Sequence, residues 1–264
     1  MILILLALAI APGLAIAIFI YERDKLDREP FHLLIKSFFL GMVSIFPAIF
    51  IELGVQMMGI APVKDNVTLT GIYAITVGFV EEICKYGVLI WFAYPRKEFD
   101  EPFDGITYAV MIAMGFATFE NVAYVVDEGL RNGMMKGVNV GFWRMISAIP
   151  AHASFGILMG YFVGMAKFKH QDSVSPLKIA GLSTAIFFHA AYDFCLFMAI
   201  YPLMFTGAFI SLLIGIGLSL RAIQLHNRNS PFLENNKKEE IEINKAEIAE
   251  RKREAQEEKK EEKV

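Results

Sequence analysis

Seven long apolar segments follow one another along the chain, and short polar loops separate them. A helix that crosses the hydrocarbon core of a bilayer needs about 20 predominantly apolar residues, and each segment offers a run of about that length. The predicted spans are residues 1–21, 34–59, 69–94, 103–126, 140–166, 177–200 and 203–222. This pattern predicts an all-α, polytopic membrane helix bundle of about seven transmembrane helices.

The basic residues of the loops predict an orientation. They concentrate in every second loop, and Lys and Arg favour the cytoplasmic side of a membrane. The first span has its basic residues after the apolar run, so we expect an uncleaved span and not a signal peptide. We expect a multi-pass protein of the cell membrane with its N-terminus outside and its C-terminus in the cytoplasm. The residues that carry this prediction are Arg23, Lys25, Arg28, Lys36, Arg96, Lys97, Lys167, Lys169, Lys178, Arg221 and Arg228.

The composition changes after the seventh span. Residues 229–264 are rich in Glu, Lys and Arg, many of them at helical spacings that pair opposite charges. We predict a transmembrane domain at 1–228 and a charged cytoplasmic tail, partly helical or disordered, at 229–264.

Overall composition supports the membrane class. The chain is 55% hydrophobic and its mean hydropathy is +0.47, which is too apolar for an ordinary soluble domain. A net charge of −3 without a basic groove argues against nucleic acid as a partner. Cys84 and Cys195 both fall in apolar runs, which predicts buried thiols and not a disulfide.

Several ionisable residues lie inside the predicted spans. A charged side chain at the centre of a spanning helix costs on the order of 2.5–3.5 kcal/mol, so such residues face the bundle interior, pair with each other or do chemistry. At 1.5 Å per residue, four spans place polar groups roughly 8–18 Å below the outer surface. We expect these groups to meet in one polar layer: Glu81, Glu120, Asn121, His152, His189 and Asp193.

The spacing within two helices predicts specific pairs. Glu81 and Lys85 are four residues apart and share a helix face, so they can neutralise each other. Glu82 is turned by about 100° from Glu81, so we expect one carboxylate to face the reaction centre and the other to meet a neighbouring helix. His189 and Asp193 also share a face, and the carboxylate can hold the imidazole in one tautomer.

Together these side chains contain the parts for activating a water molecule: a base, a proton shuttle and an electrostatic anchor. Each also has a purely structural interpretation. A Glu–Lys pair can simply join helices, His152 can be a satisfied interior histidine, and Arg144 can extend to the membrane interface. The sequence has neither a Gly-x-Ser-x-Gly elbow nor a His-Glu-x-x-His motif. The combination favours a hydrolytic site, and Glu81 is the preferred base because it shares a face with Lys85.

Four short motifs on successive predicted helices resemble those of PrsW-type intramembrane proteases, distant relatives of the CAAX prenyl proteases and bacteriocin-processing enzymes. The motifs are EEICK at 81–85, FATFEN at 116–121, RMISAIPAH at 144–152 and HAAYD at 189–193. The resemblance covers about residues 70–200 and implies a membrane endopeptidase of the glutamic or metal-assisted type. By matching position, it implies catalytic roles for Glu81, Glu82, His152, His189 and Asp193, with Lys85, Phe116, Glu120, Asn121 and Arg144 in support.

The resemblance also implies a substrate: a single-pass membrane protein such as an anti-sigma factor, cut in a site-1 step on the extracytoplasmic side of the bilayer. Asp193 stands where the wider CAAX-type relatives commonly carry Asn, and an ionised Asp cannot donate to an oxyanion, so we expect an orienting role for it. Glu81, His152 and His189 could hold Zn²⁺ with one open position. The same groups also fit acid–base chemistry without a metal, which we prefer.

Two other classes of function remain open on the sequence alone. A proton-coupled transporter could use the intramembrane Glu, His and Lys groups as a relay, although the chain lacks the paired repeats common in transporters. A sensor scaffold could instead use the charged tail to bind a partner.

Overall fold

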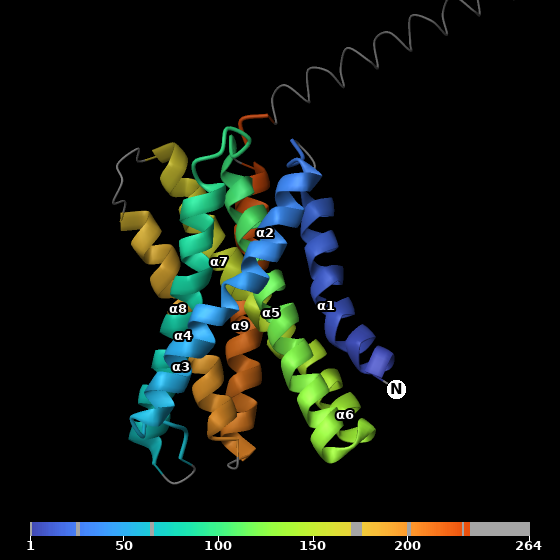
Figure 1. Cartoon of the computed structure of the whole chain (residues 1–264). Coiled ribbons are helices and arrows are strands. Elements are labelled where there is room, and N and C mark those ends of the chain that lie inside the picture. The colour runs from blue at the N-terminus through green and yellow to red at the C-terminus, as the bar shows by residue number, and fades with distance from the viewer. Residues whose placement is uncertain are drawn as a thin grey trace, which may run out of the picture.

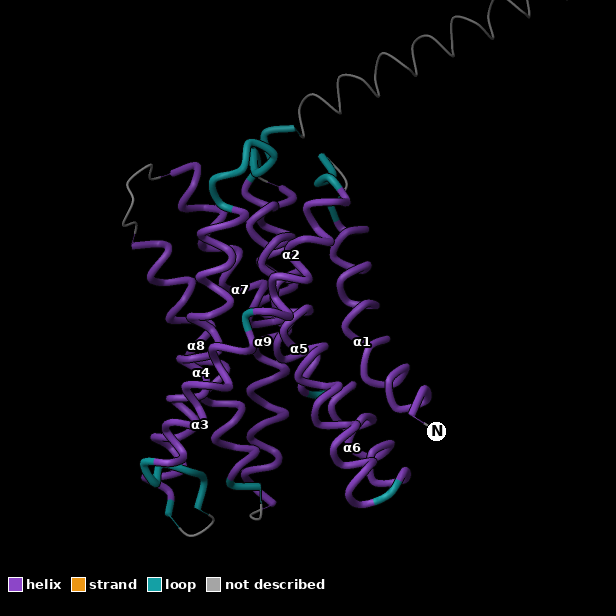
Figure 2. Tube along the Cα trace, viewed as in Figure 1, coloured by secondary structure: helices purple, strands orange, loops and turns teal. Residues whose placement is uncertain are grey.

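The computed structural model describes residues 2–24, 27–63, 66–169, 176–199, 202–228 and 230–232, and within these ranges its secondary structure is entirely helical (Figures 1 and 2). The elements are α1 (Ile2–Arg23), α2 (Phe31–Val43), α3 (Ile45–Met57), α4 (Val67–Val88), η1 (Leu89–Ala93), α5 (Pro102–Asn132), α6 (Met134–Ile146), α7 (Ala148–Lys169), α8 (Pro176–Phe197) and α9 (Pro202–Arg228). Within the described ranges, seven helical stretches are long and apolar enough to cross a membrane. The predicted all-α membrane bundle is confirmed.

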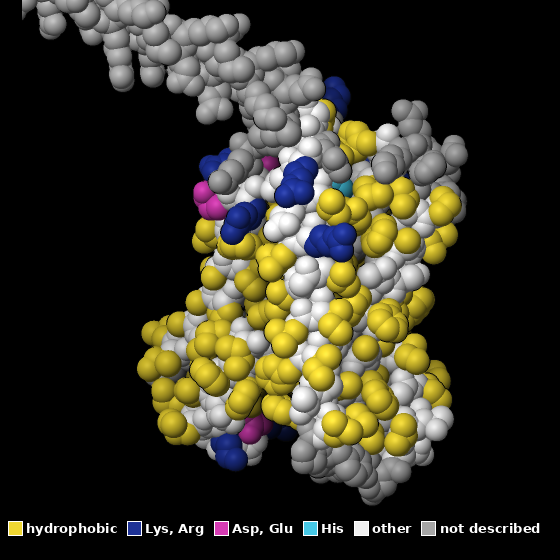
Figure 3. Space-filling model, turned by 180° about the vertical axis from the view of Figure 1, so that it is seen from behind, with side chains coloured by type: hydrophobic (Ala, Val, Ile, Leu, Met, Phe, Trp, Pro, Cys, Tyr) yellow, Lys and Arg dark blue, Asp and Glu magenta, His cyan; other side chains and the backbone are white. Residues whose placement is uncertain are grey.

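The outer surface fits a bilayer. Hydrophobic side chains cover the middle of the face seen in Figure 3, and Lys and Arg gather mainly near its upper end. Helices α5 and α9 continue past their predicted ends, to Asn132 and Arg228. Of the predicted tail only 230–232 are described, so the tail prediction lies almost wholly outside the described residues.

Two predicted spans are each broken into two helices. The span predicted at 34–59 breaks at Ser44, between α2 and α3, and the span predicted at 140–166 breaks at Ser147, between α6 and α7. Both breaks have the same cause, because Pro47 and Pro150 lie in the first turn of the second helix and have no N–H to donate to the helix before. At each break the serine hydroxyl donates to a backbone carbonyl 2.7 Å away.

Helix α5 lies at the centre of the bundle and packs most extensively against α7. The two backbones approach closely where glycines face each other. A Cβ added to Gly160 would lie 2.2 Å from the carbonyl oxygen of Gly105, and one added to Gly105 would lie 2.4 Å from that of Gly160. Small residues allow this approach, which replaces side-chain contacts with close backbone packing inside a membrane.

We expect Gly160→Ala to destabilise the protein, because its methyl group has no room beside the α5 backbone. The loss should be about 1–3 kcal/mol, measured as a lower midpoint of thermal unfolding in detergent.

The matched control is Gly217→Ala on α9. A Cβ there would meet no atom within 4 Å, and Ala favours a helix over Gly by about 1 kcal/mol. Equal destabilisation by the two variants would show that the α5–α7 contact is not tight.

Candidate active site

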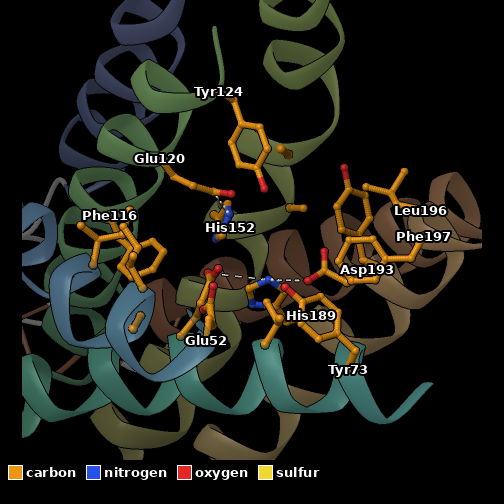
Figure 4. A pocket seen from close by; sticks show the side chains of 18 of the residues that line it. Glu52, Tyr73, Phe116, Glu120, Tyr124, His152, His189, Asp193, Leu196 and Phe197 are labelled. Atoms are coloured by element: carbon orange, nitrogen blue, oxygen red, sulfur yellow. Dashed lines mark hydrogen bonds and ion pairs between the residues drawn. The ribbon is translucent and has the colours of Figure 1, made fainter. Parts of the chain in front are cut away.

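A cavity of about 600 Å³ opens among α3, α4, α5, α6, α7 and α8 (Figure 4). It lies in the half of the bundle that contains the α3–α4 loop and the α5–α6 turn. Most of the basic residues lie at the opposite end of the bundle. Its polar lining consists of Glu52, Gln56, Tyr73, Glu81, Glu120, Tyr124, Arg144, His152, His189, Tyr192 and Asp193. The polar groups predicted to share one layer therefore do gather around one cavity, except that Asn121 lies just outside its lining.

The Glu81–Glu82–Lys85 cluster on α4 is buried, with each residue at most 6% exposed. The Lys85 Nζ donates to Glu82 Oε1 at 2.7 Å and to Glu81 Oε2 at 3.4 Å. Lys85 therefore binds its i−3 neighbour more closely than the i−4 partner predicted from the sequence. Glu81 lines the cavity and Glu82 does not, which is the division of the two carboxylates that the helical wheel predicts.

His189 on α8 is held between carboxylates. Its Nδ1 lies 2.8 Å from Glu82, and its Nε2 lies 3.3 Å from Asp193 and 3.8 Å from Glu81. Ionised carboxylates can only accept hydrogen bonds, so both ring nitrogens are placed to donate. The Phe155 ring stacks on the imidazole with its centroid 4.8 Å away. This ring was not predicted, although its position three residues after His152 places it on the same face of α7.

His152 on α7 has a neighbour at each nitrogen. Lys85 Nζ lies 3.2 Å from Nδ1, and Glu120 Oε2 lies 3.0 Å from Nε2. A lysine ammonium can only donate, so Nδ1 accepts and Nε2–H donates to Glu120. Lys85 also lies 4.4 Å from the centre of the Phe116 ring, within the range of a cation–π contact.

Arg144 does not simply extend to the membrane interface. Its Nη2 lies 2.8 Å from Glu120, and its Nε donates to Asn121 at 2.8 Å. The Asn121 amide in turn donates to the carbonyl oxygen of Ala9, which ties α1 to the site. Glu52 on α3 also lines the cavity, and one of its buried carboxylate oxygens has no hydrogen-bond partner among the described residues. From the sequence, Glu52 could either line a cavity or form a hydrogen bond between helices, and the structure places it in the cavity lining.

A profile described as the PrsW family intramembrane metalloprotease matches residues 29–220, more than half of the chain. The chain belongs to the PrsW family. Three proteins named Protease PrsW are similar to it. The protein of Bacillus subtilis (strain 168) is 32% identical over 73% of this chain and 82% of the relative. Those of Geobacillus kaustophilus (strain HTA426) and Clostridioides difficile (strain 630) are 30% and 33% identical, each over 73% of this chain and 79% of the relative. No solved structure matches it. The PrsW chain is thus a membrane-embedded peptidase, and the transporter alternative is not favoured.

The family description implies a metal ion, and the described residues contain one group that could ligate it. Ligand atoms of Glu81, His152 and His189 all lie within 4.8 Å of one another. The buried Lys85 ammonium already contacts two of these three residues, Glu81 Oε2 and His152 Nδ1. A divalent ion would have to displace this cation or lie beside it at strong electrostatic cost. As arranged here, the donors fit the lysine ammonium and do not fit a metal ion.

We expect Glu82→Gln to destabilise this PrsW protein strongly. The change removes the carboxylate that binds both Lys85 and His189 and leaves a buried ammonium with its weaker partner. Breaking a buried ion pair from one side costs about 3–5 kcal/mol, which thermal or denaturant unfolding in detergent would detect.

Glu81→Gln is the matched comparison and should cost less, because Glu81 lies farther from the ammonium. If the two variants unfold at the same midpoint, Glu82 does not hold the cluster together.

Proposed function

We propose that this PrsW protein performs site-1 cleavage of a membrane-anchored anti-sigma factor, using a water molecule activated by Glu81. The observation that carries the proposal is the convergence of a carboxylate and two imidazoles from α4, α7 and α8 on one cavity. The choice of an anti-sigma factor as substrate rests on the family resemblance.

Glu81 is placed to act as the general base. Its carboxylate lines the cavity, and its contacts with Lys85 (3.4 Å) and His189 (3.8 Å) are both long, so it can accept a proton from a water molecule. Glu82 lies outside the cavity lining and instead binds Lys85 and His189, which holds both in place. The attacking oxygen would add to the scissile carbonyl carbon as its proton passes to Glu81.

His189 is placed to stabilise the oxyanion and to protonate the leaving amine. Its Nε2 faces the same cavity as Glu81, 3.8 Å from that carboxylate, and Glu82 fixes the ring through Nδ1 at 2.8 Å. The Nε2–H contact with Asp193 is longer, 3.3 Å, and would be exchanged for the oxyanion. A fixed N–H donor at the point where negative charge develops lowers the barrier to acyl transfer. His152, with Glu120 and Arg144, would hold the Lys85 ammonium against the carboxylates.

The orientation predicted from the basic loops would place this cavity in the extracytoplasmic half of the membrane, where a site-1 cut is made. Cysteine accessibility on the α3–α4 loop and at the end of α9 would test this orientation directly. Labelling of the α9 end from outside intact cells would contradict it.

We expect Glu81→Gln to abolish cleavage of a single-pass anti-sigma factor reconstituted with the protein in vesicles. The amide is nearly isosteric but cannot accept the proton of the attacking water. Product formation followed by gel and mass spectrometry should fall by at least about 10²-fold, the lower range for loss of a general base.

Glu128→Gln is the matched control because Glu128 lies on α5 outside the cavity lining, and it should cleave like the wild type. An unrelated single-pass protein serves as a substrate control. Cleavage by Glu81→Gln at the wild-type rate would remove Glu81 from the chemistry, and equal cleavage of both substrates would remove the anti-sigma preference.

We expect cleavage to survive removal of metal ions, because Lys85 supplies the positive charge in the cluster. The protein would be purified with a strong chelator, its metal content measured, and its cleavage rate compared with and without added Zn²⁺. A rate that disappears with the chelator and returns with Zn²⁺, at one ion per chain, would establish the metal mechanism instead.

A further inference from the structure

A second group of buried carboxyl residues lies at the other end of the bundle, where α1 ends and α5 begins. Asp24 is 0% exposed, Glu29 4%, and Glu101 and Asp104 1% each. Asp104 and Glu120 are 16 positions apart on the single helix α5, so this group is about 24 Å from the cavity. It takes no part in the proposed hydrolysis.

The four carboxyl groups connect separate segments of the chain. Thr107 donates to Asp24 at 3.4 Å, and Tyr108 donates to Glu29. Asp104 Oδ2 accepts from the backbone N–H groups of residues 100 and 101, both at 2.8 Å. Ser230, two residues beyond the end of α9, donates to Glu101. The group thus joins the end of α1, the α1–α2 loop, the start of α5 and the segment after α9.

Two of the carboxylate oxygens, Asp24 Oδ1 and Glu29 Oε1, are buried without a hydrogen-bond partner among the described residues. None of the four carboxyl groups forms an ion pair with a described basic residue. An unpaired buried carboxylate is costly, and two close to each other are costlier still. A proton held within the group would remove one negative charge and supply a hydrogen-bond donor.

No basic side chain near the group forms a direct ion pair with its carboxyl groups. Lys167 on α7 lies nearby, but its ammonium donates to the carbonyl oxygens of Tyr94 and Arg96 at 2.8 and 2.9 Å. Arg28 binds the backbone carbonyl of Asp24 and the exposed Glu22. Other titratable side chains near the group are Asp27, Glu98, Asp100 and Tyr108. Among the described residues, the only group of three or more His, Cys, Asp or Glu side chains spaced to share a metal ion is Glu81, His152 and His189.

We propose that Asp24, Glu29, Glu101 and Asp104 form a proton-binding site that fastens this end of the bundle while protonated and loosens it when the protons leave. A protonated carboxyl can donate to a neighbouring carboxylate, which gives the unpartnered oxygens a hydrogen-bonding role. Proton loss leaves negative charges on neighbouring carboxylates, among them Asp24, Glu29 and Glu101. Their repulsion pushes apart the segments that the group joins, and it acts against the hydrogen bond that Ser230 donates to Glu101. The site therefore makes the attachment of the segment after α9 to the start of α5 depend on the pH at this membrane face.

The pKa shifts of these carboxyl groups have the direction that proton binding requires. Burial, with the neighbouring Glu101 and Glu29, raises the pKa of Asp24 to about 8. Burial also raises the pKa of Glu29 to about 7 and raises that of Glu101. In the unfolded chain the pKa of each of these groups is about 4. Between those values the folded protein binds more protons than the unfolded chain, so its stability falls as pH rises through this window and levels off above it.

The test is thermal unfolding of the full chain in detergent from about pH 5.5 to about pH 9. We expect the midpoint of the wild type to decrease by several degrees over this range. In the double variant Asp24→Asn, Glu29→Gln the decrease should be at most half as large, because the amides stay neutral. Asp127→Asn, an exposed change in an ion pair at the far end of α5, should keep the wild-type slope.

A wild-type midpoint independent of pH, or a slope unchanged in the double variant, would overturn the proposal. So would stabilisation by millimolar Mg²⁺ or Ca²⁺ at high pH that the double variant lacks, because the group would then bind a metal. Amide hydrogen exchange of the wild-type protein, corrected for the intrinsic exchange rates at each pH, is a second test that does not depend on the double variant folding. Residues 98–104 and 230–232 should lose protection at high pH while the residues around Glu81 keep theirs, and equal change in both regions would contradict a local proton site.

Discussion

The half of the molecule that contains the candidate active site depends on one buried ammonium. Lys85 contacts Glu81 and Glu82 on its own helix and His152 on α7, and Glu82 passes the interaction to His189 on α8. In a medium without water, this charge cannot exist unless its partners are fixed around it. The same ion cluster therefore determines how α4, α7 and α8 meet and leaves Glu81 facing the cavity.

Close backbone packing makes that geometry possible. Hydrocarbon chains offer no hydrophobic driving force between helices, so association relies on tight contact and polar bonds. Facing glycines let α5 approach α7, and α5 carries Glu120 while α7 carries His152. The breaks at Ser44 and Ser147 end α2 and α6, and the helices that follow, α3 and α7, begin beside the cavity. The site is thus a product of where helices stop as much as of where they run.

Much of this could be predicted from the sequence. Apolar length predicted the seven spans, and helical spacing predicted the contacts of Glu81 with Lys85 and of His189 with Asp193. Periodicity describes a single helix, however, so it could not show that Glu82 would reach His189 or that Arg144 would bind Glu120. The helix breaks could not be predicted because hydropathy stays high across them. The acid group near Ser230 could not be predicted because its members come from two distant parts of the chain, residues 24–29 and 101–104, and its partner Ser230 comes from a third.

The two buried acid groups show different solutions to the cost of removing a carboxylate from water. Around the cavity, Lys85 and Arg144 supply fixed positive charge, so Glu82 and Glu120 have partners that do not depend on a proton from solvent. At the other end no described cation pairs with Asp24 or Glu29, and burial raises the pKa of both. A catalytic centre needs constant charge to keep its geometry, whereas a group neutralised by protons responds to its surroundings. One chain can thereby keep its site rigid while one membrane face responds to pH.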